Sequence, residues 1–223
     1  YAANYNYNTG YRFTPSYDYE FFKQQSSASR SAGNGSNWTL KTYLTYNGTF
    51  GKHNVSVMAG HEAQENNWES LDGSRTNFLF NSVHELNAGA ATTAKANSSR
   101  GSSAIESYFG RLNYNFADRY LLTATLRADG SSSFAKESRW GWFPSVALAW
   151  KVNNEAFLKD VEAINSLKLR LGWGVVGNQW AGSYAYGVTM PSAASIWGTG
   201  VYAGHYPNPS MKWEEPTSDT LGL

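Results

Sequence analysis

The 223-residue chain contains no cysteine. Disulfide-stabilised scaffolds and thiolate metal centres are therefore excluded, although the absence does not separate one cellular compartment from another. The chain also lacks an excess of charge of either sign, because its formal net charge is +1 and its lysines and arginines are spread along the sequence. A bulk electrostatic attraction to nucleic acid is not expected, so we predict no nucleic-acid partner.

Long hydrophobic runs are absent as well, since no segment approaches the ~18 consecutive apolar residues of a membrane-spanning helix. A helical membrane protein is thereby excluded. A membrane β-barrel is not, because its strands face lipid on one side only and hide their hydrophobicity in alternation. Proline and methionine are sparse at 6 and 3 residues, whereas glycine reaches 21 residues and aromatic residues 16% of the chain. This composition favours strands and turns.

The two ends of the chain carry no mark of a complete protein. The sequence begins at Tyr1, without an initiator methionine or a signal peptide, and it stops at Leu223 within an apolar alternation. We expect both ends to be internal points of a longer protein.

Residues 38–66 alternate apolar and polar side chains with a period of two, interrupted only at Gly51-Lys52. A period of two is typical of a strand whose faces meet different surroundings. The interruption predicts a two-residue hairpin turn. If Phe50 faces His53 across that turn, the larger apolar side chains of both strands fall on one face.

Residues 107–129 predict a second hairpin with its connection at residues 117–119. Pairing Phe116 with Tyr120 places Leu112 opposite Ala124 and collects the apolar side chains on one face. The other face is polar, and in a barrel its side chains would line the lumen. The expected lumen-facing residues of this hairpin are Arg111, Asn113, Arg127 and Asp129.

Residues 140–175 predict a third hairpin, with Lys168 and Arg170 among the lumen-facing positions of its second strand. Within its connection we expect a short helix over residues 154–161, capped by Asn154. A further strand is expected from Met211, with a bulge at Pro216 because proline cannot donate to the ladder.

The connections alternate in length. The expected turns at 51–52 and 117–119 are tight, whereas 67–107, 130–139 and 176–210 are expected to be long extracellular loops. Residues 1–37 are expected to form a polar, tyrosine-rich extracellular loop that could hold a strand. Short turns at one end and long loops at the other are the arrangement of outer-membrane barrels, and only the connection 151–166 departs from it.

The alternation alone suits a soluble β-sandwich equally well. Two features favour an all-β fold of the antiparallel transmembrane β-barrel class. Strands of about ten residues match a tilted crossing of the bilayer. Aromatic residues also lie near both ends of the expected strands, as two membrane-interface girdles require. These are Phe50, Phe116, Tyr120 and Trp150 near the turns, and Tyr108 and Trp140 near the loops.

The motifs of the second half resemble those of a known family. Residues 107–131, SYFGRLNYNFADRYLLTATLRADGS, closely resemble a hairpin of SusC/RagA-type TonB-linked outer-membrane proteins. Further motifs before and after this hairpin occur in the same order as in that family. The resemblance covers about residues 38–223. They are FGKHN at 50–54, RWGWFPS at 139–145, LKLR at 167–170, GNQ at 177–179 and NPSMKWE at 208–214.

The resemblance implies a barrel of about 22 strands with a plugged lumen, of which this chain would hold roughly a third. It also implies TonB-dependent import of glycans, oligosaccharides or oligopeptides, with a SusD-like surface lipoprotein and TonB as partners and outer-membrane lipid around the barrel. The plug domain and the TonB-contacting segment are expected to lie outside this chain. A passive porin or adhesive barrel, or a soluble carbohydrate-binding sandwich, remain the alternatives.

Small residues recur at positions of lumen parity, and two explanations stay open. They leave room for a packed element inside the barrel, or they merely ease the curvature of the sheet. The positions are Gly141, Ser145, Ala147, Ala149, Gly172 and Gly174.

No catalytic, cofactor or metal site is predicted. The histidines at 53, 61, 84 and 205 lack metal-ligand spacing, and His53 and His61 share a strand face where packing in an aromatic girdle is expected. Substrate contacts, if this chain makes any, are expected from loop aromatics, because flat rings stack on sugar faces and pack against peptide side chains. The alternative is that these rings pack the loop against itself or against the lipoprotein partner. The candidates are Trp180, Tyr184, Trp197 and Tyr202.

Overall fold

The computed structural model describes residues 1–158, 166–180 and 186–223. The described residues form strands joined by turns, with four short 3-10 helices and no α-helix among them. The long strands are β1 (Ala2–Thr14), β4 (Ser27–Phe50), β5 (His53–Thr76), β6 (Lys95–Phe116), β7 (Tyr120–Ser131), β8 (Trp140–Lys151), β9 (Lys168–Val175) and β12 (Thr217–Gly222). The short strands are β2 (Tyr17–Tyr19), β3 (Phe22–Gln24), β10 (Ser192–Ser195) and β11 (Gly198–Val201), and the 3-10 helices are η1 (Leu86–Ala88), η2 (Ala91–Thr93), η3 (Lys136–Ser138) and η4 (Val152–Asn154).

The eight long strands pair in one sheet of order β1-β4-β5-β6-β7-β8-β9-β12. Each strand pairs with the next long strand of the chain, so the topology is an up-and-down meander, and the sheet is open because β1 and β12 are its edges. The chain divides into two compact units, which are described separately. Unit 1 holds residues 1–39 and 65–102, and unit 2 holds residues 40–64 and 103–223.

The hairpin registers predicted for unit 2 are confirmed. In the β6–β7 pair, Phe116 lies opposite Tyr120 and Leu112 lies opposite Ala124. β4 ends at Phe50 and β5 begins at His53, with Gly51 in the left-handed region at φ 63°. The expected β4–β5 register is supported by two cross-strand contacts, Thr49 Oγ1 to Asn54 Oδ1 at 2.9 Å and Lys41 Nζ to Glu62 Oε1 at 2.8 Å.

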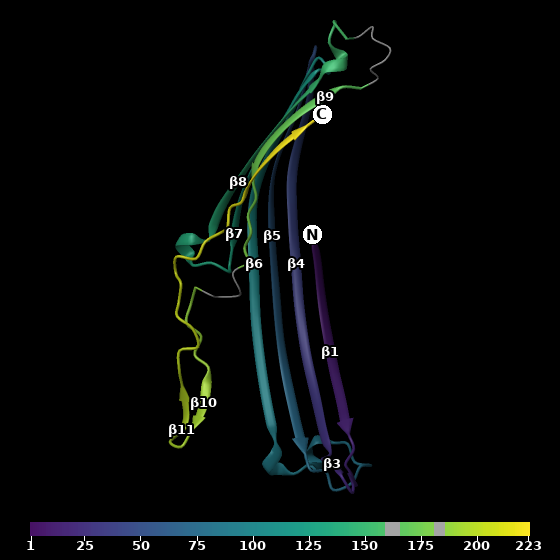
Figure 1. Cartoon of the computed structure of the whole chain (residues 1–223), viewed down its shortest axis with the longest axis vertical. Helices are drawn as coiled ribbons and strands as arrows, with labels where there is room; N and C mark the ends of the chain where they lie inside the picture. Colours follow the sequence, from purple (N-terminus) through teal and green to yellow (C-terminus); the bar gives the residue numbers. More distant parts are fainter. Residues whose placement is uncertain (159–165, 181–185) are drawn as a thin grey trace. The chain divides into compact units, whose positions relative to one another are not determined.

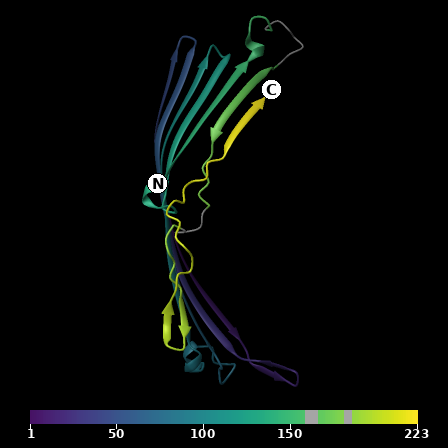
Figure 2. The same cartoon turned by 60° about the vertical axis from the view of Figure 1, so that its left-hand side comes forward.

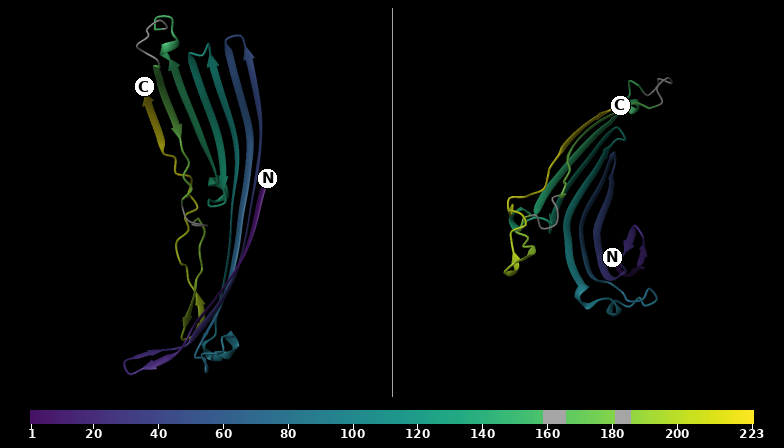
Figure 3. Two further views of the ribbon diagram at one scale, coloured as in Figure 1. Left: turned by 90° about the vertical axis from the view of Figure 1, so that its right-hand side faces the viewer. Right: turned by 60° about the horizontal axis from the view of Figure 1, so that its bottom comes forward.

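The tight turns of unit 2 are neighbours. The Ala117 amide donates to the Lys52 carbonyl at 2.7 Å, and the Lys151 amide donates to the Arg119 carbonyl at 2.8 Å. β7, β8 and β9 lie side by side as antiparallel neighbours in the sheet (Figure 3). The connection after β8 is tied closed because the Val152 amide donates to the Leu167 carbonyl at 2.9 Å.

Unit 1 corrects the expectation of long loops at 1–37 and 67–107. Residues 2–14 form β1, and β4 already begins at Ser27. β1 pairs with β4 over its whole length, from Ala2 opposite Thr39 to Thr14 opposite Ser27. β5 continues to Thr76 and β6 begins at Lys95, so these strands are far longer than predicted (Figure 1). The added lengths of β4, β5 and β6 are rich in Asn, Ser and Gly on both faces, which removes the hydropathy alternation on which the prediction depended.

Three smaller expectations also change. Asn154 lies at the end of η4 and residues 155–158 form a bend and a turn, because the backbone folds back to the start of β9; residues 159–161 of the expected helix lie outside the described residues. The last strand begins at Thr217 and not at Met211, since Pro216 interrupts the ladder and its carbonyl accepts from the Val176 amide at 3.0 Å. Residues 176–210, expected to be a loop, contain the β10–β11 hairpin (Figure 2).

The buried core of unit 2 lies where the segment before β12 crosses β8. Phe134, Phe143 and Trp213 are at most 8% exposed and pack together with Val175 and Met211. The Phe143 and Trp213 ring centroids are 5.2 Å apart in an edge-to-face arrangement, and the Trp213 indole donates to the Arg139 carbonyl at 2.8 Å. The NPSMKWE motif therefore has a structural role, because its Trp213 holds the segment before β12 against β8.

Candidate functional site

One face of the unit 2 sheet is a continuous apolar surface. The pairing registers of β6 to β9 place the large apolar side chains of neighbouring strands on the same face. All of them are at least 37% exposed, so nothing within the described part of the chain covers them. This apolar face comprises Leu40, Leu44, Tyr46, Phe50, Val57, Tyr108, Tyr120, Leu126, Trp140, Trp142, Val146, Leu148, Leu171 and Trp173.

A row of aromatic rings crosses the apolar face beside the tight turns. Phe116 stacks on Tyr120 with centroids 6.3 Å apart, and Tyr120 stacks on Trp150 at 6.4 Å. The row extends to His53, whose ring lies 4.8 Å from that of Phe116. We call His53, Phe116, Tyr120 and Trp150 the turn-side row. Phe50 ends β4 next to the turn that leads to His53.

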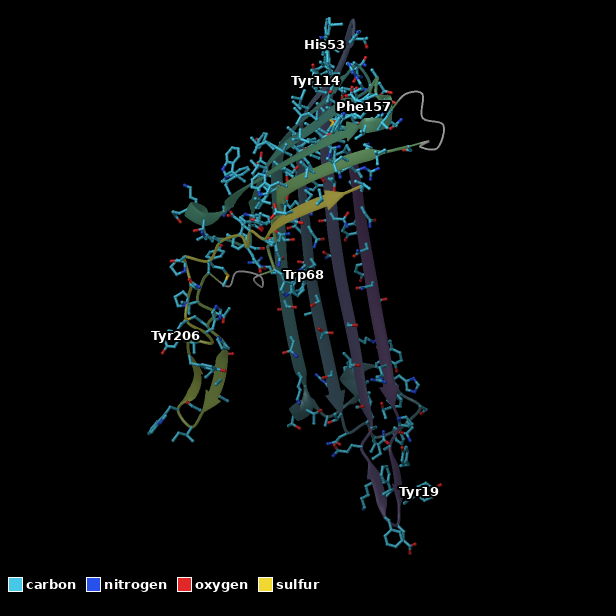
Figure 4. All side chains as sticks on the ribbon, turned by 45° about the horizontal axis from the view of Figure 1, so that its top comes forward. Tyr19, His53, Trp68, Tyr114, Phe157 and Tyr206 are labelled. Carbon is cyan, nitrogen blue, oxygen red and sulfur yellow. The ribbon has the colours of Figure 1, made fainter. Side chains whose placement is uncertain are left out.

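A second row crosses the same face farther from the tight turns. The ring centroids of His61 and Tyr108 are 4.8 Å apart, and those of Tyr108 and Trp140 are 6.0 Å apart. We call these three residues the loop-side row. The turn-side row lies at strand ends, as predicted. The loop-side row corrects the prediction, because β5 continues to Thr76 and β6 begins at Lys95, so Tyr108 lies within its strand and only Trp140 begins one. A girdle role of both rows stays a prediction. His53 and His61 pack in them, and His53 Nδ1 lies 2.7 Å from the Tyr114 hydroxyl (Figure 4).

Glu155 ties the turn-side row to the connection after β8. It is 8% exposed, and it accepts hydrogen bonds from the Tyr120 hydroxyl at 2.7 Å, the Trp150 indole at 2.9 Å and the Arg119 guanidinium at 2.7 Å. These donors, Tyr120 foremost, hold the pKa of the Glu155 carboxyl below its ordinary value of 4.5. Sequence reasoning missed this residue. The only signal was the unusual length of its connection.

A neighbouring ion pair fixes the turn before β7. Lys151 Nζ lies 2.6 Å from Asp118 Oδ1, and the Asn154 side chain donates to the Asp118 carbonyl at 2.8 Å. The hydrogen bond from the Lys151 ammonium is the main cause that lowers the pKa of the Asp118 carboxyl. The turn end of unit 2 is thus held by two carboxylates that each bind a cation.

The opposite face of unit 2 is polar and carries a charge network. The Arg127 Nε lies 2.7 Å from Asp129 Oδ1, and its Nη2 donates to the buried Ser107 hydroxyl at 2.8 Å. Arg127 also lies 3.9 Å from Glu62, which in turn pairs with Lys41 at 2.8 Å. Opposite charges alternate across β4, β5 and β7, so each of these four charged side chains has a counter-charge beside it.

The six predicted lumen-facing residues share this polar face. Arg127 and Asp129 join directly in the network, while the other four are dispersed over it. Arg111 donates to Thr125 at 3.4 Å, and Asn113 accepts from Thr123 at 3.0 Å. Lys168 and Arg170 follow on β9 opposite Lys151 and Ala149.

The small residues of the polar face divide into two groups. At Gly141, a Cβ would lie 2.5 Å from the Phe143 ring and 2.9 Å from the Trp213 ring, so the space is filled by side chains of this chain. At Gly172 the nearest heavy atom would be 3.7 Å away, which is ordinary contact. Room for a further packed element therefore lies over β9 and not over the start of β8.

The loop aromatics are exposed and are not gathered in one cavity within the described ranges. Trp180 is 93% exposed, and Trp197 is 91% exposed at the turn of the β10–β11 hairpin. Tyr202 follows β11, where its amide donates to the Pro191 carbonyl at 3.1 Å. Tyr184 lies outside the described residues. A role in substrate contact stays a prediction for all four.

The described ranges contain no group of three or more His, Cys, Asp or Glu side chains that could hold a metal ion. They also contain no helix that is long and apolar enough to cross a membrane.

Residues 1–222 match the family model described as TonB dependent receptor-like, beta-barrel. The chain belongs to this family. The match covers the whole meander, including the unit 1 strands that the sequence motifs did not reach. Proteins of this family are outer-membrane β-barrels and not enzymes, and the localisation and the barrel class predicted from the sequence are confirmed.

Curated relatives agree. The TonB-dependent receptor SusC of Bacteroides thetaiotaomicron is 38% identical over 198 residues, which are 84% of this chain and 19% of SusC. TonB-dependent receptor P3 of Formosa agariphila is 35% identical over 195 residues, which are 85% of this chain and 20% of that receptor. The chain thus spans about a fifth of the length of the curated relatives it matches.

Solved structures show the same fold. The RagAB peptide importer in its closed-closed state matches with a TM-score of 0.86 at 21% identity, over 98% of this chain and 24% of the importer chain. In the open-open state the TM-score is 0.85 at 21% identity, over 99% of this chain and 24% of that chain.

Proposed function

We propose that the protein containing this chain imports glycans, oligosaccharides or oligopeptides across the bacterial outer membrane, energised through TonB and assisted by a SusD-like surface lipoprotein. The observation that supports this most is the separation of the unit 2 sheet into an exposed apolar face and a polar, charge-paired face. The similarity to the TonB-dependent receptor SusC supports TonB-dependent import, and the similarity to the RagAB peptide importer supports a peptide cargo.

In this proposal the apolar face contacts lipid and the polar face lines the lumen. A strand of a membrane barrel alternates between these surroundings, because each successive side chain points to the opposite face. The turn-side and loop-side rows then lie at the two membrane interfaces, where Trp, Tyr and His rings place an apolar body and a polar tip. The tight turns are periplasmic and the longer connections extracellular.

The charge network supports a filled lumen. The side chains of Arg127 and Glu62 are partly buried, and paired charges with small neighbours suit a packed polar contact better than a wide water channel. We propose that a plug, supplied by another part of the protein, packs on the polar face over Gly172, where an added Cβ would meet only ordinary contact.

Uptake by living cells tests the proposal. The experiment uses cells that express the full-length protein together with the SusD-like lipoprotein encoded by an adjacent gene. These cells should accumulate labelled oligosaccharide or oligopeptide only while the inner membrane is energised and TonB is present. Uptake that continues at the same rate without TonB would show a passive porin instead. Protein that stays in solution without detergent would show a soluble module.

A further inference from the structure

Unit 1 presents a face with a chemistry unlike the rest of the sheet. Asn6 on β1 lies opposite Gly35 on β4. The hydrogen bonds of Asn34 with Glu69 at 2.6 Å and of Trp38 with Glu65 at 3.0 Å fix the β4–β5 register, which places Gly35 opposite Trp68. Side chains of this face therefore form rows that cross four strands.

In two neighbouring rows, an asparagine on β1 lies opposite a glycine on β4. A Cβ on Gly35 would lie 2.8 Å from Asn6 Oδ1, and a Cβ on Gly33 would lie 2.7 Å from Asn8 Oδ1, so each amide extends over a glycine. Ser70 and Ser99 share a hydrogen bond of 2.8 Å in the next row position. The glycines keep the surface low and leave the amides exposed.

Trp68 supplies an aromatic ring to this part of the face. A Cβ on Gly101 would meet Cε2 and Nε1 of the indole at 2.7 Å and Cζ2 at 2.8 Å. Three ring atoms at nearly equal distance mean that the indole lies flat over Gly101. Trp68 is still 48% exposed, so the face of the ring that points away from Gly101 is accessible to solvent.

We propose that this surface, the amide face, binds a neutral oligosaccharide, with Trp68 as the platform for one sugar ring. It is formed by Asn6, Asn8, Asn66, Trp68, Ser70 and Ser99. The inference rests on the proposed function of nutrient import, and it selects one of its two cargo classes.

The chemistry of the amide face matches a sugar. A pyranose has an apolar C–H face that packs on an aromatic ring, and a rim of hydroxyls that both donate and accept hydrogen bonds. Side-chain amides and serine hydroxyls also both donate and accept, which suits hydroxyls better than purely accepting or donating groups. None of the six residues is charged. A phosphate or carboxylate ligand would call for Arg or Lys at this place.

A peptide suits the amide face less well. Extended peptides commonly bind by adding a strand to an exposed sheet edge. Trp68 lies on β5, which is an interior strand flanked by β4 and β6. Its backbone groups are already used in the sheet, so recognition here depends on side chains alone.

The test uses the full-length protein, purified in detergent with its lipoprotein partner and applied to an array of neutral and acidic oligosaccharides and hexapeptides. The wild type should bind at least one neutral oligosaccharide. Trp68→Ala should weaken that binding about tenfold, as loss of an aromatic stacking partner does. Trp68→Phe should recover part of it. Gly101→Ala should also weaken binding, because the new Cβ displaces the ring while every polar group stays.

Tyr5→Ala is the matched control, since Tyr5 is 67% exposed on the opposite face of β1, and it should bind like the wild type. If Trp68 only covers Gly101, the Trp68→Ala variant melts at a lower temperature but binds as before, and the proposal is overturned. Absence of neutral oligosaccharide binding by the wild type also overturns it. TonB-dependent uptake is measured in a separate experiment. The proposal of import and the proposal of oligosaccharide binding at the amide face can therefore be refuted independently.

Discussion

The Trp150 indole donates a hydrogen bond of 2.9 Å to the carboxylate of Glu155, five residues further along the chain. The contact joins the turn-side row to the connection that closes the β8–β9 hairpin. A carboxylate with three donors restrains Trp150, Tyr120 and Arg119 together, so one buried acid orients the end of the row.

Glu155→Gln should lower the melting temperature of the protein at neutral pH, because a neutral amide accepts these hydrogen bonds less strongly than a carboxylate. The folded-state pKa of Glu155 is depressed, so its stabilising contribution is present above the unfolded value of about 4.5 and is lost as the pH falls through the folded value. The melting temperatures of wild type and variant should therefore converge in acid. The exposed Glu20, changed to Gln, provides the control. A difference that persists unchanged in strong acid would contradict this account.

Phe143→Ala should lower the free energy of unfolding by about 3–5 kcal/mol, the usual effect of removing a buried aromatic ring. Phe143 is 7% exposed and packs on Trp213 and Phe134. Urea unfolding in detergent micelles measures the effect. Phe157→Ala is the control, because Phe157 is 67% exposed, and it should change the free energy by less than about 0.5 kcal/mol. Equal effects of both changes would show that the cluster is not a core.

Leu148→Cys and Ala147→Cys, made separately, test the assignment of the two faces. The residues are neighbours on β8 and point to opposite faces, and residues 1–223 contain no cysteine. Any cysteine elsewhere in the full-length protein is replaced by serine before labelling. A nitroxide attached to the Leu148→Cys variant should collide with lipid-soluble oxygen far more often than with a water-soluble nickel reagent. A nitroxide attached to the Ala147→Cys variant should not. Similar water accessibility of both labels would remove the lipid-facing assignment of the apolar face.

The registers of unit 2 were predictable because each strand has one apolar face. A shift of the register by one residue would move every apolar side chain of a strand to the polar face. Pairs such as Phe116 with Tyr120 could therefore be deduced from the sequence alone. Both histidines of the aromatic rows could be placed by the same parity.

The strands of unit 1 could not be deduced in this way. In β1, asparagines and tyrosines alternate, and Asn6 and Tyr7 are both exposed, so neither face reads as a core. The contacts of Glu155 and Trp213 were hidden for another reason. Trp213 donates to the Arg139 carbonyl, 74 residues away, and no local spacing reveals such a contact. The residues of the amide face were missed because glycine, serine and asparagine indicate loops when taken singly.

Replacing Trp180 and Trp197 together by Ala should reduce uptake several-fold if these exposed rings contact the substrate. Neither side chain is buried, at 93% and 91% exposure, so stability should change by less than about 0.5 kcal/mol. Uptake of labelled substrate and its affinity for purified protein are both measured, with Phe157→Ala as the control. Unchanged affinity and import would leave these rings with a packing role only.

Ala117→Gly should stabilise the β6–β7 turn. Ala117 has φ 54°, in the left-handed region, which costs a residue with a Cβ about 1–2 kcal/mol. Glycine removes this strain but gains freedom in the unfolded chain, so we expect a net gain of about 0.5–1 kcal/mol. The midpoint of urea unfolding should rise.

Gly51→Ala is the matched converse. Gly51 has φ 63° in the β4–β5 turn, and a Cβ there would meet nothing within 4 Å, so the change tests backbone conformation alone. It should destabilise the protein by about 1 kcal/mol. The two turns are joined by the hydrogen bond from the Ala117 amide to the Lys52 carbonyl, so they report on one end of the sheet. Because the strain argument requires opposite signs for the two substitutions, equal signs would refute it.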